Sequence, residues 1–257
     1  MKHRQINNVS LVASDIHIDD VIKVGSDNCL RIDKIPADLQ AAFDSMHQKV
    51  QHSMTISHNA ELLEQHKIPM SRSLFTNLFV FTKVIADKFP KLACVDNSRQ
   101  SFYSKTPTAN LSEMFEKQLF QCAEFAVIAQ LYLQSINVNS EYVGGEYLMT
   151  ENDEFGEQHS FVIIHENDND FVFDPANNTK GNIPNISIVE LSPEQKLKIQ
   201  AKLLSGKRKV AFFETRNIIT GKKQFYGYGD GCNILEDMIF KKEKNILNTP
   251  ANDLSRD

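Results

Sequence analysis

Three residues of the chain have the types that nucleophilic catalysis by a thiol requires: Cys122, His159 and Asp174. Cys122 stands before the apolar stretch AEFAVIAQLYL, and we expect a helix to begin near Gln121. The free N–H groups and the dipole of a helix N-terminus favour an anion, and therefore the thiolate form of a cysteine placed there. Cys122 is the candidate nucleophile; the alternative is that its side chain only fills space in the core.

The stretch EQHSFVIIHENDNDFVFDPAN supplies candidate partners for the thiol. His159 begins one alternating run and Asp174 ends the next, with a polar turn at 166–169 between them. A hairpin centred on this turn pairs Val162 with Phe171 and His159 with Asp174, which places opposed Cβ atoms about 4.5–5.5 Å apart. The carboxylate would then orient the imidazole toward the thiol, as the third member of a triad does. A register shift of one residue would destroy this pairing.

Further residues near these stretches have weaker claims to a role. Gln118 and Gln121 precede the thiol, and either side chain is a candidate donor to an oxyanion beside the backbone N–H of Cys122. The alternative is that both glutamines are exposed helix residues. Cys232, which follows the glycine-rich GYGDG, is the second candidate nucleophile, and His165 is expected to be exposed at the turn, away from any carboxylate.

Composition bounds the classes of protein to consider. The chain has 257 residues, of which 41% are hydrophobic and 24% charged, so it is long enough for one large domain or two small ones. The net charge of −5 argues against a general binder of nucleic acid or of anionic membranes. No apolar run is long enough for a secretory signal or for a membrane span of about 20 residues.

The cysteines indicate a reducing compartment rather than a disulfide framework. They are far apart and form no C-x-x-C pair, at Cys29, Cys94, Cys122 and Cys232. Structural zinc requires closely spaced Cys and His ligands, which the sequence lacks, and no dinucleotide fingerprint is present. We therefore expect neither a metal nor a cofactor.

The elements that must position these residues follow from the apolar periodicity. Helical spacing predicts helices over 36–67, 73–89, 122–136, 192–204 and 232–244, with a weak helix from Leu111. Alternation predicts strands over 141–149, 159–165, 170–174 and 210–215. Residues 95–110 are expected to form a loop, and 226–231 a glycine-rich turn.

Helices that come first, followed by strands, indicate an α+β architecture rather than an alternating parallel sheet. We divide the chain into a mainly helical region over 1–95, a catalytic core over 96–247 and a polar tail over 248–257. The helical region is either a lobe that positions the substrate or a simple scaffold.

The blocks QCAEFAVIAQLYL, EQHSFVII and FVFDPAN together resemble the papain-like and transglutaminase-like cysteine enzymes. The closest similarity is to bacterial effector and toxin domains that cleave, deamidate or crosslink host proteins. The resemblance covers about residues 111–178 and implies a helical lobe packed on an antiparallel β-sheet, with Cys122 as nucleophile, His159 as base and Asp174 as orienter. Papain-like enzymes place an oxyanion glutamine six residues before the cysteine, where this chain has Glu116, and Asn177 is an alternative orienter.

The predicted function is therefore a cysteine protease or protein-glutamine deamidase that acts on a protein substrate, such as a host protein, through a thioester. The alternatives are a transglutaminase, a small-molecule acyltransferase with the same triad, and a non-catalytic interaction protein that keeps the fold. The chain would be cytoplasmic, or secreted by a specialised system without a Sec signal; secretion is implied by the resemblance alone.

Overall fold

The structure is a computed structural model that describes residues 5–6, 9–10, 12–13, 15–24, 28–53, 63–64, 67–88, 98–148, 150, 156–179, 183–190 and 211–228. The helices are α1 (Ala37–Ser53), α3 (Arg72–Lys88), α4 (Ser98–Lys105), α5 (Leu111–Glu116) and α6 (Cys122–Ser135). The long strands are β7 (Ser140–Leu148), β8 (Glu157–Glu166), β9 (Asn169–Thr179), β10 (Ile183–Val189), β11 (Ala211–Asn217) and β12 (Lys223–Tyr228). The short strands are β1 (Gln5–Ile6), β2 (Val9–Ser10), β3 (Val12–Ala13), β4 (Val21–Lys23), β5 (Cys29–Arg31) and β6 (Thr108–Asn110).

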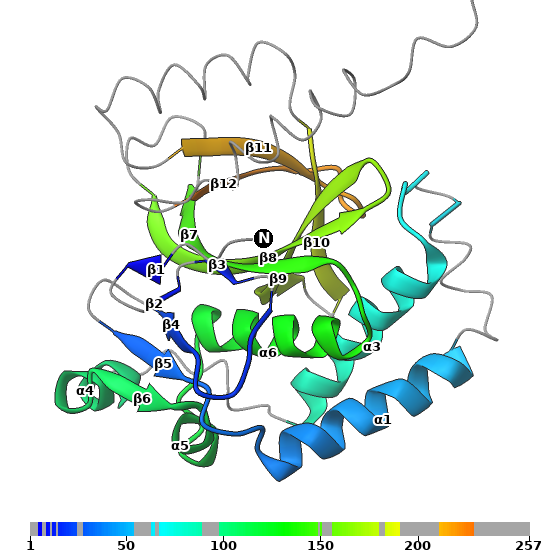
Figure 1. The fold of residues 1–257 in the computed structure, drawn as a ribbon. Helices are drawn as coiled ribbons and strands as arrows, with labels where there is room; N and C mark the ends of the chain where they lie inside the picture. The colour runs from blue at the N-terminus through cyan, green and yellow to red at the C-terminus, as the bar shows by residue number, and fades with distance from the viewer. Residues whose placement is uncertain are drawn as a thin grey trace, which may run out of the picture.

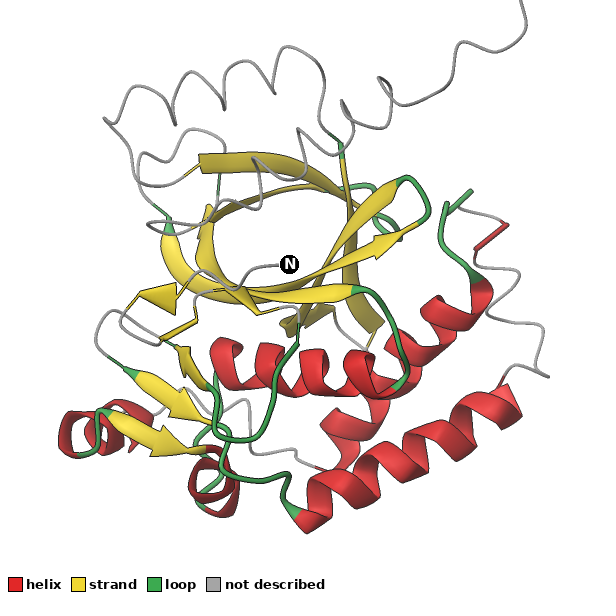
Figure 2. Ribbon diagram, in the orientation of Figure 1, coloured by secondary structure: helices red, strands yellow, loops and turns green. Residues whose placement is uncertain are grey.

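The six long strands form a closed antiparallel barrel. Each strand from β7 to β12 pairs with the next, and β12 returns to pair with β7. The strands in Figure 2 accordingly make a ring seen nearly end-on. Closure pairs the edges that an open sheet would expose. The edge of β7 that pairs with β12 also pairs with β3, through Tyr142 and Val143 near the start of the strand.

Glycine makes the closing seam between β7 and β12 possible. Tyr228 pairs with Gly145 across this seam, and Glu146 pairs with Gly227. A Cβ atom on Gly145 would lie 2.1 Å from the carbonyl oxygen of Gly227, which is far inside van der Waals contact. The two backbones can therefore approach closely only because Gly145 has no side chain.

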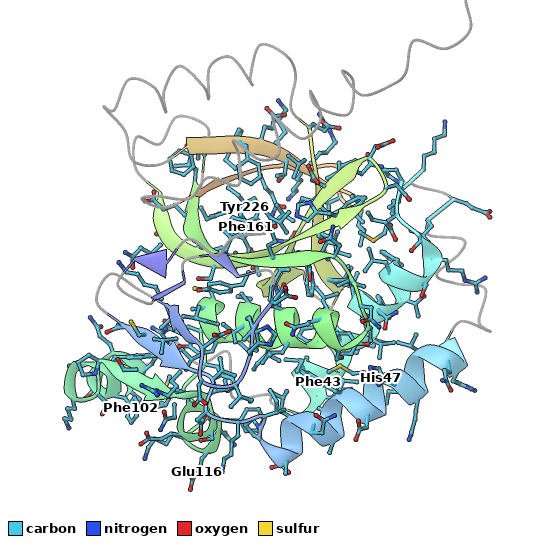
Figure 3. All side chains as sticks on the ribbon, in the orientation of Figure 1. Phe43, His47, Phe102, Glu116, Phe161 and Tyr226 are labelled. Atoms are coloured by element: carbon cyan, nitrogen blue, oxygen red, sulfur yellow. The ribbon has the colours of Figure 1, made fainter. Side chains whose placement is uncertain are left out.

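Alternate residues of each barrel strand face opposite sides. One set of apolar side chains, which includes Val162 and Phe173, joins the buried cluster of the helices. The other set meets inside the barrel, where the rings of Phe161 and Tyr226 lie 4.9 Å apart (Figure 3). His159 lies on the same face of β8 as Phe161, so the alternation places it on the inner face.

The helices cover one side of the barrel, with α6 against β7, β8 and β9, and α1 against α3 (Figure 1). Tyr132 on α6 is fully buried and joins these layers, since its ring lies 5.4 Å from both Phe43 on α1 and Phe81 on α3. Phe81 in turn meets the edge of Phe173 on β9 at 5.8 Å. This aromatic chain fixes α6 on the barrel.

A second, small sheet is built from the short strands in the order β1-β2-β4-β5-β6. β6 brings α4 and α5 with it, so these helices lie beside the small sheet (Figure 1). The predicted division at residue 95 stays a prediction; β5 pairs with β6 and β3 with β7 across it.

The predicted fold class, a papain-like or transglutaminase-like helical lobe packed on an antiparallel sheet, is wrong. The strands close into a barrel, a second sheet stands beside it, and the helices form no separate lobe on an open sheet. The reason is the pairing of β12 with β7, which joins residues about 80 positions apart. Periodicity along the chain carries no information about such a contact.

Several element predictions are confirmed and others need correction. The helices over 73–89 and 122–136, the short helix from Leu111 and the strand over 210–215 agree with α3, α6, α5 and β11 to within a few residues. The predicted loop over 95–110 contains α4 and β6, and the predicted turn from residue 226 begins inside β12. The predicted helices over 192–204 and 232–244 lie outside the described residues, as do 54–62 of the first helix.

Candidate active site

The helix α6 begins at Cys122, as the sequence predicts, and a defined N-terminal cap fixes this start. Gln121 is the N-cap residue in an extended conformation, with φ −133° and ψ −161°. Its backbone N–H donates to Oε2 of Glu124 at 2.9 Å, which is one half of a capping box. Cys122 is therefore the first residue of the helix, and its free thiol is half-buried rather than sealed in the core.

His159 and Asp174 are brought together on the barrel. Nε2 of His159 lies 2.7 Å from Oδ2 of Asp174, with 11% of the His159 side chain exposed and 1% of that of Asp174. The pair thus has a short hydrogen bond that is largely shielded from water. Such shielding strengthens a charge-assisted bond.

The Asp174 carboxylate is held from several sides. Oδ2 also accepts from the hydroxyl of Tyr226 at 3.1 Å and from Nδ2 of Asn177 at 3.0 Å. Oδ1 accepts from the backbone N–H groups of Ala176 and Asn177, both at 3.2 Å. These donors offset the cost of burying the carboxylate and fix its direction toward His159.

Tyr226 is suited to its role as a donor. Burial inside the barrel and the charge of Asp174 raise the pKa of Tyr226 well above its ordinary value. The hydroxyl therefore stays protonated, accepts from Nδ2 of Asn185 at 3.4 Å and donates to Asp174. Asn185 is in turn bonded by Asn217 at 2.8 Å, so a polar chain crosses the barrel to the carboxylate.

His159 also interacts with Cys122. Burial would lower the pKa of His159, but the charge and hydrogen bond of Asp174, together with a hydrogen bond and charge from Cys122, raise it to about 10. Since Nε2 is bonded to Asp174, Nδ1 is the ring nitrogen left to face the sulfur. The imidazole thus interacts with both a carboxylate and a thiol, and its raised pKa favours the protonated form at neutral pH.

The strand register that joins these residues differs from the predicted one. The tight turn pairs Glu166 with Asn169, and Val162 consequently faces Phe173 instead of Phe171. Asn167 adopts the left-handed conformation, φ 54°, that a two-residue hairpin loop requires. The shift is two residues, an even number, so every side chain keeps its predicted face.

His159 and Asp174 are therefore diagonal neighbours rather than opposed ones, and the described pairing of β8 with β9 extends only as far as Val162 and Phe173. Diagonal neighbours remain within reach of long side chains. The predicted contact survives an error in the predicted register.

An ion pair beside Cys122 was not predicted from the sequence. Arg99 on α4 bonds Oε1 of Glu124 with Nη2 at 2.7 Å, and its Nε lies 2.9 and 3.0 Å from the two carboxylate oxygens. Tyr103 donates to the same Oε1 at 3.1 Å. Glu124 is fully buried. Burial opposes the charge of Arg99, but the charge and hydrogen bonds of Glu124 raise the pKa of Arg99. The signal available in the sequence was Glu124 three residues after the N-cap residue Gln121, a spacing that is typical of a capping box.

The two candidate oxyanion glutamines differ in position. Gln121 is half-buried at the N-cap, and its Oε1 lies 3.5 Å from Nη1 of Arg99. Gln118 is exposed in the turn after α5, with φ 54°, and no described contact joins it to the triad. Glu116 is also exposed and lies on the outer side of α5 (Figure 3). Asn177, the alternative orienter, contacts both His159 and Asp174: its Nδ2 lies 3.5 Å from Nε2 of His159 and donates to Oδ2 of Asp174.

The prediction that His165 is exposed and far from carboxylates is wrong. Its Nδ1 lies 2.7 Å from Oδ1 of Asp170, and its Nε2 lies 3.8 Å from Oε1 of Glu141. Burial opposes the charge, but these two carboxylates raise the pKa of His165 to about 9. The tight turn opposes His165 to Asp170 directly, and the predicted register did not. A second His–Asp pair therefore closes the turn end of the hairpin, with no described cysteine beside it.

Cys94 and Cys232 lie outside the described residues, and Cys29 is a half-buried free thiol in the small sheet. Among the described residues, no group of three or more His, Cys, Asp or Glu side chains is arranged to hold a metal ion. Within the same residues, no helix combines the length and apolar character needed to cross a bilayer.

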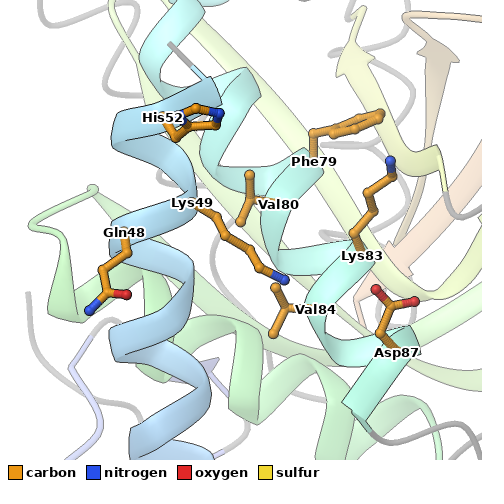
Figure 4. Close-up of a pocket in the computed structure, with 8 residues that line it drawn as sticks. All are labelled: Gln48, Lys49, His52, Phe79, Val80, Lys83, Val84 and Asp87. Carbon is orange, nitrogen blue, oxygen red and sulfur yellow. The ribbon is translucent and has the colours of Figure 1, made fainter. Parts of the chain in front are cut away.

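A groove of about 360 Å³ between α1 and α3 is separate from the triad (Figure 4). Its lining is Gln48, Lys49, His52, Phe79, Val80, Lys83, Val84 and Asp87. Its lining contains none of Cys122, His159 and Asp174.

No family model, curated protein or solved structure matches this chain. The comparisons therefore give no support to the resemblance to papain-like and transglutaminase-like enzymes.

Proposed function

We propose that the chain is a thiol hydrolase that acts on carboxamide bonds of a protein substrate through Cys122, His159 and Asp174. One observation carries the proposal: the His159 imidazole bonds Asp174 at 2.7 Å with Nε2 and also interacts with Cys122 at the start of α6. A proton carrier that interacts with both a nucleophile and an orienting carboxylate is what acyl transfer by a thiol requires.

In the first step, the Cys122 thiolate attacks the carbonyl carbon of the amide, and the carbonyl oxygen becomes an oxyanion. The backbone N–H of Cys122, which has no partner four residues earlier in the helix, and the side-chain amide of Gln121 are the candidate donors to this oxyanion. As the C–N bond breaks, the His159 imidazolium gives its proton to the leaving amine, and a thioester remains on the sulfur. Asp174 orients the ring and stabilises its charged form before this transfer.

In the second step, neutral His159 takes a proton from water, which attacks the thioester and releases a carboxylic acid and the free thiol. The product is a cleaved peptide when the amide is in the backbone, and a glutamate when it is a glutamine side chain. An amine in place of water gives a crosslink. The same three residues serve each reaction, because the difference lies in what reaches the thioester.

Acetylation by p-nitrophenyl acetate tests the proposal without knowledge of the natural substrate. We expect one acetyl group on Cys122 by peptide mass, removable by hydroxylamine as a thioester is, and we expect Cys122→Ser and His159→Ala to abolish it. Cys29→Ser is the matched control, because Cys29 is also a half-buried free thiol but burial raises its pKa. Acetylation of Cys29 as fast as that of Cys122, or none on Cys122, contradicts the proposal.

The reaction branch is then assigned from candidate protein substrates by mass: fragments indicate a protease, glutamine converted to glutamate a deamidase, and joined chains a transamidase. An acyl adduct formed on Cys122 with acyl-coenzyme A instead indicates a small-molecule acyltransferase. A Cys122→Ala variant that keeps full biological activity indicates a non-catalytic interaction protein.

A further inference from the structure

We propose that Arg99 is a positioning residue of this site, which fixes the Gln121 amide and the start of α6 so that an oxyanion donor faces the bond attacked by Cys122. The inference rests on the proposed function. It adds to the triad a residue from α4, an element of the small-sheet side of the molecule (Figure 1).

The Arg99 guanidinium has little freedom to move. Three short contacts of 2.7–3.0 Å attach Nε and Nη2 to the Glu124 carboxylate, and Nη2 also lies 3.4 Å from the carbonyl oxygen of Val24. The Tyr103 ring lies beneath, with its centre 4.8 Å from the guanidinium carbon. A planar fork held in this way places its remaining nitrogen, Nη1, in one direction.

That direction is toward Gln121. Nη1 lies 3.5 Å from Oε1 of Gln121, the acceptor end of the side-chain amide. An amide carries its oxygen and its NH₂ group on opposite sides, so holding the oxygen toward Arg99 turns the two N–H donors away from it. Cys122 is the next residue along the chain. The Gln121 side chain also accepts from the backbone N–H of Glu124 in the capping box. Arg99 adds to this contact and favours the orientation of Gln121 in which its NH₂ group is free to donate to an oxyanion.

A purely structural role accounts less well for these contacts. A buried ion pair seldom adds more stability than apolar side chains of similar size, so packing alone gives no reason for charge at this position. The pair also holds the residue that directly precedes the nucleophile, since Glu124 accepts the Gln121 backbone N–H and Arg99 contacts the Gln121 side chain.

The test compares two reactions of Cys122 in Arg99→Met and in the double variant Arg99→Met/Glu124→Gln. Arg99→Met leaves Glu124 buried and unpaired and is expected to unfold at a lower temperature, whereas the double variant removes both charges and recovers most of the loss. Alkylation by iodoacetamide forms no oxyanion, but acetylation by p-nitrophenyl acetate does. We expect the ratio of acetylation rate to alkylation rate to fall about tenfold or more in the double variant, as loss of an oxyanion donor does.

The matched control is Arg216→Met/Glu190→Gln, which removes an exposed ion pair of 3.1 Å on the barrel. We expect this control to leave the ratio unchanged. A double variant that folds and keeps the ratio to within about twofold overturns the Arg99 inference. His159→Ala separates the two proposals: normal acetylation in that variant refutes the triad, whereas slow acetylation there with a normal ratio in the double variant refutes only the role of Arg99.

Discussion

Asp174→Asn removes the negative charge beside His159 and changes the shape of the side chain very little. The Asp174 carboxylate accepts the 2.7 Å bond from Nε2 of His159, and its charge opposes the effect of burial on the imidazole. Without that charge, burial dominates and disfavours the imidazolium. The thiolate of Cys122 then loses its cationic partner at neutral pH, although every atom needed for the reaction is still present.

The magnitude follows from the pKa of His159. Asp174 and Cys122 together raise that pKa to about 10 against the effect of burial, and without the charge of Asp174 it is expected to fall toward its ordinary value of about 6.5. At a pH of about 7.5, the protonated fraction of the ring then falls from nearly all to about one tenth. Alkylation of Cys122 through the thiolate–imidazolium pair is therefore expected to slow about tenfold at this pH.

The assay is limiting iodoacetamide between about pH 5 and 9, with the modified cysteine identified by peptide mass. Asp170→Asn is the matched control, because it removes the negative charge that lies 2.7 Å from Nδ1 of His165 at the other end of the same hairpin. We expect the control to react as the unchanged protein does. The role given to Asp174 is refuted if Cys122 is alkylated at the original rate throughout this range in Asp174→Asn. It is also refuted if Asp170→Asn slows the alkylation of Cys122 equally.

Two further predictions concern stability. His159 and His165 have folded-state pKa values raised to about 10 and about 9. The stability that their protonation adds to the folded state is therefore complete below about pH 6.5 and is lost as the pH rises through those values. Thermal unfolding scans should show this loss, and His165→Gln should make the loss near pH 9 smaller. Gly145→Ala should lower the free energy of unfolding by about 3 kcal/mol or more in urea, because the new Cβ meets Gly227 at the barrel seam. Gly221→Ala is its comparison, with φ 68° and open space around it; it should cost about 1–2 kcal/mol, and an equal cost for both would contradict the seam argument.

The sequence by itself determined the parts of the site that depend on local patterns. The apolar run after Cys122 requires a buried helix, and Glu124 three residues after the N-cap favours its observed start. Alternation around His159 and before Asp174 requires two strands with these residues on one face. The face survived the error in register because the pattern has a period of two and the shift was an even number.

The tertiary structure alone decided the features that depend on contacts between distant segments. Barrel closure requires β12 to reach β7, and the open-sheet prediction failed because nothing in either strand specifies its second neighbour. Residues 98–105 have weak helical periodicity, and the burial of Tyr103 together with the bonds from Arg99 to Glu124 fixes them as α4. Periodicity reports which face of an element is buried, whereas the identity of the partner is set by packing and charge that only the folded chain brings together.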